Sequence, residues 1–255
     1  MLQGKNPPRN SRDKGTFFST INMPGPEQMA TDIMLLEKTM MDSDVSLAIR
    51  FYNWKGLWLS IGKNQKYLPR NWQKLIINRK LQIVRRPSGG SAVLHGSGLT
   101  YALIWLSPPR KKLEAYYLAS QWLIKGFSEL GLPLQFGDQP TNSYETDCFA
   151  TSTAADLIDS DGQKRIGSAQ VWRKGHLLQH GEIILDPPSQ LWMEVFKTKA
   201  PTPAPSSIPR EGLDKFLRKT CISYWPEISW QYDEFNQKEL ERISVSAEQY
   251  VLHSN

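Results

Sequence analysis

The sequence has few of the features that mark exported or membrane proteins. Only two of its 255 residues are cysteines, Cys148 and Cys221, which gives neither a disulfide framework nor a CxxC metal motif. No apolar run approaches the roughly 18 to 20 residues that cross a bilayer. Residues 1–15 are polar and basic without an apolar core, so we expect a disordered leader over 1–20 and no signal peptide. These absences favour a cytoplasmic protein with no membrane partner.

Familiar ligand-binding motifs are also missing. There is no GxxxxGK[ST] and no GxGxxG between a strand and a helix, which excludes a P-loop and a Rossmann site. His95, His176 and His180 lack a metal-ligand spacing with carboxylates, so we expect no metal held by the protein. The net charge of +6 favours an acidic partner. No nucleic-acid-binding motif accompanies the charge, so a nucleic-acid partner is not favoured.

The residues that are present suit one sizeable core. Hydrophobic residues make up 40% of the chain, with nine each of Trp, Tyr and Phe. Apolar residues at helical spacing predict helices over 26–41 and 113–130, the second ending at Gly131. β-branched and aromatic runs predict strands at 46–54, 57–61, 81–86, 99–106, 166–172 and 177–185. We expect the first two to form a hairpin around Lys55-Gly56, with later turns at 159–162 and 174–175.

These elements predict an α/β fold with a mixed, largely antiparallel sheet flanked by helices. The Pro-rich stretch TKAPTPAPSSIP (198–209) is typical of a linker. We therefore predict a catalytic domain over 21–197, a linker over 198–209 and a C-terminal helical extension over 210–255.

The most informative segment is the glycine-rich loop within RRPSGGSAVLHGSGLTYALIW (85–105). Gly89 and Gly90 allow a positive φ and close approach of a ligand, and their N–H groups can cradle an anion. Arg85 and Arg86 would add charge to that cradle. A plain glycine turn between two core strands explains the same residues equally well, so composition alone leaves both interpretations open.

This segment resembles the conserved loop of the biotin and lipoate protein ligase superfamily, in which two Arg, a Ser or Thr, successive Gly, Ala-Val and His precede a strand. Three more segments resemble that family in the same order: QMATDIMLLE (28–37), LAIRFYNWKGLWLSIGKNQ (47–65) and QKRIGSAQVWRKGHLLQHGEIILD (163–186). The resemblance implies a ligase domain similar to class II aminoacyl-tRNA synthetases. Ser91 departs from the family pattern, which usually has Gly or Arg there.

The resemblance implies two catalytic residues. Lys164 has the family's offset from Gly167-Ser168-Ala169, where an ammonium points into the acyl pocket and neutralises an oxyanion or binds phosphate. Cys148 stands where the LipM-type octanoyltransferase branch has its nucleophile, with Thr153 at the place of the usual Ser. Without the resemblance, Lys164 reads as a solvated surface lysine and Cys148 as a buried, inert thiol. Arg165 should face away from the pocket, and Cys221 lies outside the resemblance.

The same comparison implies an acyl- or nucleotide-binding set in the loop and in the later strands. For two of its members, His95 and His180, a satisfied core histidine is an equally good interpretation. The set is Arg86, Ser88, Gly89, Gly90, Ser91, Ala92, Val93, Leu94, His95, Gly167, Ser168, Ala169, His180 and Gly181.

The implied reaction is transfer of an octanoyl or lipoyl group from an octanoyl-carrier protein, through Cys148, to a lysine of a lipoyl domain or H-protein. It needs no cofactor. The alternative is a lipoate-protein ligase that uses ATP and Mg²⁺ to form lipoyl-AMP. We favour the transferase because of Cys148, because the ligases' Arg-Asn-Asp segment is missing, and because we expect too little chain after Asp186 for the ligases' accessory domain. A non-catalytic lipoyl- or carrier-binding protein and a biotin transferase are further alternatives.

Overall fold

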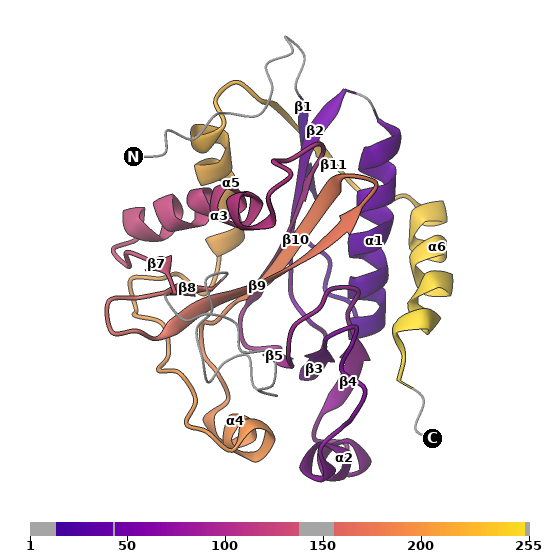
Figure 1. Ribbon diagram of the computed structural model, residues 1–255, viewed down its shortest axis with the longest axis vertical. Coiled ribbons are helices and arrows are strands. Elements are labelled where there is room, and N and C mark those ends of the chain that lie inside the picture. Colours follow the sequence, from indigo (N-terminus) through magenta and orange to yellow (C-terminus); the bar gives the residue numbers. More distant parts are fainter. Residues whose placement is uncertain (1–13, 43, 138–155, 253–255) are drawn as a thin grey trace.

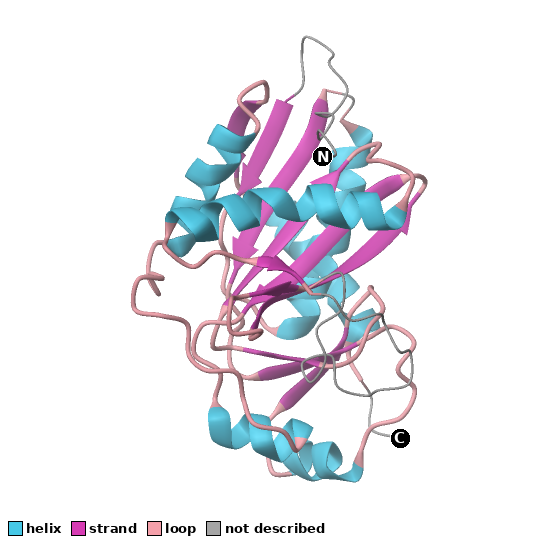
Figure 2. Cartoon of the chain, turned by 60° about the vertical axis from the view of Figure 1, so that its left-hand side comes forward, coloured by secondary structure: helices cyan, strands magenta, loops and turns pink. Residues whose placement is uncertain are grey.

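A computed structural model of the chain describes residues 14–42, 44–137 and 156–252. Its strands form two sheets, a large one with the order β11-β1-β2-β6-β10-β9-β8-β7 and a small one with the order β4-β3-β5. The two sheets lie one beyond the other along the molecule (Figure 2). The large sheet comprises β1 (Lys14–Phe18), β2 (Val45–Tyr52), β6 (Leu99–Trp105), β7 (Gln135–Phe136), β8 (Leu157–Ile158), β9 (Lys164–Arg173), β10 (His176–Ile183) and β11 (Ser229–Asp233). The small sheet comprises β3 (Trp58–Ile61), β4 (Gln82–Arg85) and β5 (Val93–His95).

Helices cover both faces of the large sheet. Figure 1 shows α3 and α5 on one side and α1 and α6 on the other, with α2 and α4 at the end near the small sheet. The helices are α1 (Gly25–Met41), α2 (Arg70–Ile77), α3 (Lys112–Glu129), α4 (Ser189–Phe196), α5 (Leu213–Tyr224) and α6 (Gln237–Ala247). None of the helices that the structure describes is long and apolar enough to cross a membrane.

The central strands are buried on both faces, which explains their nearly continuous apolar sequences. In β2, Leu47, Ile49 and Phe51 enter the core beneath α3 and α5. Ala48 and Tyr52, on the opposite face of the same strand, enter the core beneath α1. Pairing is antiparallel from β2 through to β7 and parallel from β11 to β2. The predicted mixed, largely antiparallel α/β fold is therefore confirmed.

The predicted hairpin between the strands at 46–54 and 57–61 is wrong. β2 pairs with β1 and β6, whereas β3 pairs with β4 and β5 in the small sheet. Between them the Lys55 N–H donates to the Met23 carbonyl, which carries the chain away from β2. Leu59 and Ile61 of β3 enter a third core formed with α2 and α4. A glycine turn predicts a change of direction and does not identify the strand that pairs next.

The other predicted helices and turns are confirmed. α1 and α3 match the two predicted helices within a few residues, and Gly131 has a φ of +78° just after α3. β9 and β10 form the predicted antiparallel hairpin at Lys174-Gly175, where both residues have positive φ. The short strand β5 inside the glycine-rich segment was not predicted.

The C-terminal part is closely joined to the rest of the chain. Ala204 and Ile208, in the predicted linker, are buried in the core beneath α3 and α5. Residues 210–255 are not purely helical, because β11 pairs in parallel with β1 at the edge of the large sheet. α6 packs against α1. Within the predicted disordered leader over 1–20, Lys14–Phe18 form the ordered strand β1 between β11 and β2. The division of the chain into domains otherwise stays a prediction.

Candidate active site

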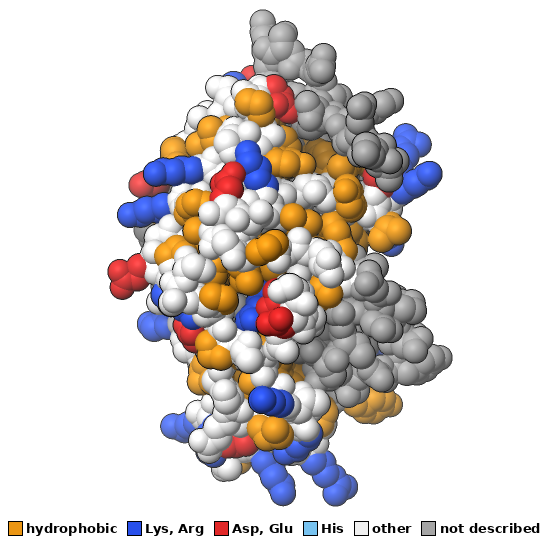
Figure 3. Space-filling view, turned by 90° about the vertical axis from the view of Figure 1, so that its left-hand side faces the viewer, with side chains coloured by type: hydrophobic (Ala, Val, Ile, Leu, Met, Phe, Trp, Pro, Cys, Tyr) orange, Lys and Arg blue, Asp and Glu red, His pale blue; other side chains and the backbone are white. Residues whose placement is uncertain are grey.

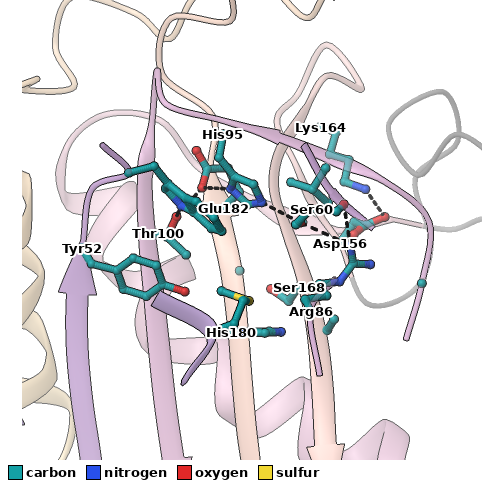
Figure 4. A pocket seen from close by; sticks show the side chains of 17 residues that line it. Tyr52, Ser60, Arg86, His95, Thr100, Asp156, Lys164, Ser168, His180 and Glu182 are labelled. Carbon is teal, nitrogen blue, oxygen red and sulfur yellow. Dashed lines mark hydrogen bonds and ion pairs between the residues drawn. The ribbon is translucent and has the colours of Figure 1, made fainter. Parts of the chain in front are cut away.

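A cavity lies where the two sheets meet beside the N-terminal half of α1 (Figure 4). Ten residues of its lining belong to the predicted site: Arg86, Gly90, Val93, His95, Lys164, Gly167, Ser168, Ala169, His180 and Gly181. Seven were not predicted: Met29, Tyr52, Trp54, Ser60, Thr100, Asp156 and Glu182. The structure thus brings the glycine-rich segment, β9 and β10 together around one cavity.

Of the predicted residues that the structure describes, five do not line the cavity. The prediction that Ala92 and Leu94 line the site is wrong, since both are buried in the core beside α2 and α4. Successive side chains of a strand point to opposite faces, so Val93 and His95 of β5 face the cavity and Leu94 faces away. The other three, Ser88, Gly89 and Ser91, hold polar groups of the lining in place.

Lys164 begins β9 and is only 6% exposed. Its Nζ lies 3.0 Å from Asp156 Oδ2, so the buried ammonium is paired with a carboxylate at the cavity wall. A Cβ at position 167 would lie 2.9 Å from Lys164 Cε, so Gly167 provides the space that the lysine stem occupies. Arg165 faces away, as predicted, and donates to Asp159 Oδ2 (2.6 Å) and to the Thr202 carbonyl.

The glycine-rich loop is held by Arg86, the second of the two arginines before it. Arg86 donates to the Ser60 carbonyl (3.0 Å), the Gly89 carbonyl (2.6 Å) and the Ser91 carbonyl (2.7 Å). Gly90 has a φ of +86°, as the need for glycine predicted, whereas Gly89 does not have a positive φ. These donors fasten the loop's own carbonyl groups, and Arg86 also lines the cavity, so its role in binding the acyl group or a nucleotide stays a prediction.

A first polar network closes one side of the cavity. His95 Nδ1 lies 2.8 Å from Glu182 Oε2, and its Nε2 lies 2.7 Å from Ser60 Oγ. The Thr100 hydroxyl donates to the same carboxylate, and the Trp54 ring stacks on His95 at 4.0 Å. Burial lowers the pKa of His95 despite the neighbouring carboxylate. A neutral His95 then donates from Nδ1 to Glu182 and accepts from Ser60.

A second polar network is centred on Asp32 of α1. Asp32 accepts from Arg50 Nε (2.9 Å) and the Tyr52 hydroxyl (3.0 Å), and its Oδ2 lies 2.8 Å from His180 Nδ1. His180 Nε2 in turn lies 2.6 Å from Ser88 Oγ. Burial and the Asp32 carboxylate raise the pKa of Tyr52, so its hydroxyl remains a donor. Sequence analysis did not predict Asp32 as a site residue. The feature that could have indicated it is an aspartate on the apolar face of a predicted helix.

The carboxylates around the cavity are engaged with other protein groups. Asp32 pairs with Arg50, Asp156 with Lys164, and Glu182 with His95. Within the described ranges there is no group of three or more His, Cys, Asp or Glu side chains that could hold a metal ion.

Of the two cysteines, the structure describes only Cys221. Cys148 and Thr153 lie outside the described residues, so the role of Cys148 stays a prediction. The Gly137 N–H donates to the Asp156 carbonyl at 3.0 Å, and Asp156 also lines the cavity. Cys221 is fully buried in the core beneath α3 and α5, and burial raises its thiol pKa well above the ordinary value. Such a thiol is unreactive.

Comparison with solved structures first shows which known proteins share the fold. Protein Ta0514 of T. acidophilum, solved with bound lipoic acid, has the same fold, with a TM-score of 0.74, 16% identity and coverage of 93% of this chain and 95% of that one. The bipartite lipoate protein ligase of Thermoplasma acidophilum, described with its E2 lipoyl domain, gives a TM-score of 0.69 at 16% identity, covering 93% and 92%.

The sequence itself then shows the family. The profile of the lipoyl protein ligase A/B catalytic domain matches residues 24–219, so the chain belongs to this family. The octanoyltransferase LipM of Geobacillus kaustophilus is 32% identical over 206 residues, which cover 74% of this chain and 72% of that protein. The resemblance inferred from the four sequence segments is confirmed.

Proposed function

We propose that the protein is an octanoyl (or lipoyl) transferase that acylates a lysine of a lipoyl carrier domain through a thioester on Cys148. The observation that carries the proposal is the buried Lys164–Asp156 pair on the wall of a cavity bordered by the glycine-rich loop. The similarity to an octanoyltransferase over most of the chain supports the same reaction.

In the first half-reaction the Cys148 thiolate attacks the carbonyl carbon of an octanoyl thioester on a carrier protein. The tetrahedral intermediate breaks its bond to the carrier sulfur, and the carrier leaves as a thiol after taking up a proton. In the second half-reaction the neutral amine of the acceptor lysine attacks the new thioester. An amide forms, the amine's proton is lost and the Cys148 thiolate is restored. Neither step consumes ATP.

Lys164 supplies positive charge where the oxyanion of each intermediate forms. A buried ammonium acts more strongly than one in water, because the surrounding dielectric is low. The same charge lowers the pKa of a neighbouring thiol and increases its thiolate fraction. The acyl chain is uncharged, and Met29, Trp54, Val93 and Ala169 give the cavity an apolar lining that suits it.

The acceptor follows from charge and from similarity. The chain carries a net charge of +6 and therefore favours an acidic protein partner. A ligase of the same fold has been described with an E2 lipoyl domain. Both points support a lipoyl domain or H-protein as the acceptor.

The second candidate is an ATP-dependent lipoate-protein ligase that passes through lipoyl-AMP and requires Mg²⁺. The observation that favours it is the fold, which the chain shares with lipoate protein ligases. Lys164 would then bind the phosphate of the adenylate.

One experiment separates the two candidates. Incubation with octanoyl carrier protein, without ATP, should add one octanoyl group to the enzyme, which is detected as a mass increase of the intact protein. Hydroxylamine should remove the group, because it cleaves thioesters. Cys148→Ser should prevent the addition, since a serine hydroxyl lacks the acidity of a thiol, and the matched control Cys221→Ser should not. If Cys148→Ser keeps full activity and that activity requires ATP and Mg²⁺, the ligase is the correct assignment.

A further inference from the structure

Acidic residues are absent from a long part of the chain. Residues 45–113 contain no Asp or Glu but thirteen Lys and Arg, although the whole chain has 25 acidic and 31 basic residues. This acid-free segment includes the small sheet, α2 and the glycine-rich loop. Figure 3 shows Lys and Arg side chains gathered at the end of the molecule that α2 and α4 form. Part of the excess positive charge therefore lies on the small sheet and the glycine-rich loop, which border the cavity.

A cleft concentrates this charge beside the cavity. It lies between α1, the end of β9, α6 and the segments at the C-terminal ends of β3 and β4, and we call it the basic cleft. Its charged lining consists of one carboxylate, Glu37, and five cations: Lys63, Arg85, Arg86, Arg173 and Arg242. Positive potential in a concave site attracts an anionic partner more strongly than the same charges spread over a convex surface.

The positive charge of the basic cleft is only partly compensated. Glu37 pairs with Arg173, and both side chains are more than 40% exposed, so this pair is weakly held. Arg85 donates to the carbonyl groups of Gly62 (3.1 Å) and Gln65 (2.6 Å), which leaves its charge unneutralised. Lys63 and Arg242 are exposed and form no ion pair with any residue that the structure describes.

The basic cleft and the acyl cavity share a wall. Arg86 lines both, and its guanidinium fastens the glycine-rich loop between them. Lys164, in contrast, lines the cavity but not the cleft. A partner seated in the cleft is therefore close to the cavity without touching the reaction centre.

We infer that the basic cleft is the docking site of the acidic carrier protein that donates the acyl group. This inference rests on the proposed function and adds a location to it. A donor fits better than an acceptor, because an acyl carrier presents its thioester on a flexible arm, which can extend past Arg86 into the cavity while the carrier itself stays in the cleft. The acceptor's lysine side chain is short, and its domain must approach Lys164 closely.

The test uses two donors with the full-length enzyme. One is octanoyl carrier protein, and the other is an octanoyl thioester of a small neutral thiol, which has no acidic surface. Lys63→Glu/Arg242→Glu should raise KM for the carrier about tenfold and leave kcat, and all constants for the small thioester, unchanged. Raising the salt concentration should raise the parent's KM for the carrier, because salt screens the charges. The difference in KM between the parent and the variant should therefore become smaller.

The matched control is Lys215→Glu/Lys219→Glu, which makes the same charge change on the exposed side of α5, across the large sheet from the cleft. Its KM for the carrier should stay within about twofold of the parent's. The inference is overturned if the cleft variant keeps the parent's KM, if the α5 variant shows the same rise, or if the KM that rises is the one for the acceptor domain. Absence of transfer from octanoyl carrier protein to the acceptor domain in the parent would instead contradict the proposed function.

Discussion

At the scale of single residues, Lys164 has two roles that must be tested separately. It is the proposed source of charge for the oxyanion, and it is half of a buried ion pair with Asp156, both side chains being 5% exposed. Removing one partner of such a pair leaves a buried charge without compensation and costs about 3 to 5 kcal/mol. A loss of activity in a Lys164 variant is therefore informative only when stability is measured beside it.

We predict that Lys164→Met lowers kcat for octanoyl transfer at least about 100-fold, because the oxyanion loses its positive charge. The double variant Lys164→Met/Asp156→Asn removes both charges and should recover most of the lost stability without recovering activity. Urea unfolding and single-turnover acylation measure the two effects. Recovery of turnover in the double variant would show that Lys164 serves only the fold.

His95 provides a test by pH. Its pKa lies below the ordinary value of 6.5, chiefly because of burial. As the pH falls below about 6.5 the unfolded chain gains a proton that the folded protein does not, so the free energy of unfolding decreases until the lowered pKa is reached. The contribution is fully present above the unfolded pKa. It amounts to at most about 1.4 kcal/mol for each unit by which the pKa is lowered.

The measurement compares the parent with His95→Gln, whose amide does not titrate, between pH 7 and pH 5. The parent should lose more stability over this range than the variant. His176→Gln, at a partly exposed histidine, should behave like the parent. An equal loss in all three proteins would mean that His95 titrates normally in the folded state.

At the scale of elements, the glycine-rich loop is the segment whose backbone matters most. A Cβ on Gly62, at the end of β3, would lie 1.9 Å from the Gly90 carbonyl oxygen, so the loop packs directly against the small sheet. Gly90 also lines the cavity and has a positive φ. The backbone conformation at Gly90 therefore helps to determine the shape of the acyl site.

We predict that Gly90→Val weakens binding of octanoate at least about tenfold, because a β-branched side chain resists a φ of +86° and crowds the cavity. Gly89→Val is the matched control, since a Cβ there has no heavy atom within 4 Å and φ is not positive. Calorimetric titration with octanoate compares the two. Equal affinities of the two variants for octanoate would show that the loop is only a turn and does not shape the acyl site.

Sequence reasoning identified the elements better than their partners. Apolar patterns located α1, α3 and β6, because these elements bury most of their apolar side chains in the core. The same patterns could not show that β3 leaves the large sheet, since its partners β4 and β5 are chosen by the third core. Likewise Glu182 and Asp32 entered the site only through tertiary contacts with His95 and His180. Lys164 was identified through the family resemblance, because its flanking sequence alone is typical of a solvated surface lysine.

At the scale of the whole molecule, the C-terminal segment is the part where the predicted organisation and the observed packing differ most. Lys38 of α1 pairs with Asp233 (2.7 Å) and with Glu239 of α6 (2.8 Å). Arg218 of α5 donates to the Phe18 carbonyl at the end of β1. Residues near both ends of the described chain are therefore held together, and we expect them to unfold together.

The last prediction tests this cooperativity with two neighbouring residues of α6. Ile243 is 1% exposed and packs in the core beneath α1, whereas Val245 is 81% exposed. Ile243→Ala should lower the free energy of unfolding by about 2 to 4 kcal/mol, because it leaves a cavity in a core shared with the large sheet. Val245→Ala should change it by less than about 0.5 kcal/mol. Tryptophan fluorescence and circular dichroism should follow one shared urea transition that Ile243→Ala shifts as a whole. A separate early transition for the C-terminal segment, with the remainder unaffected, would show that residues 210–255 form an independent extension.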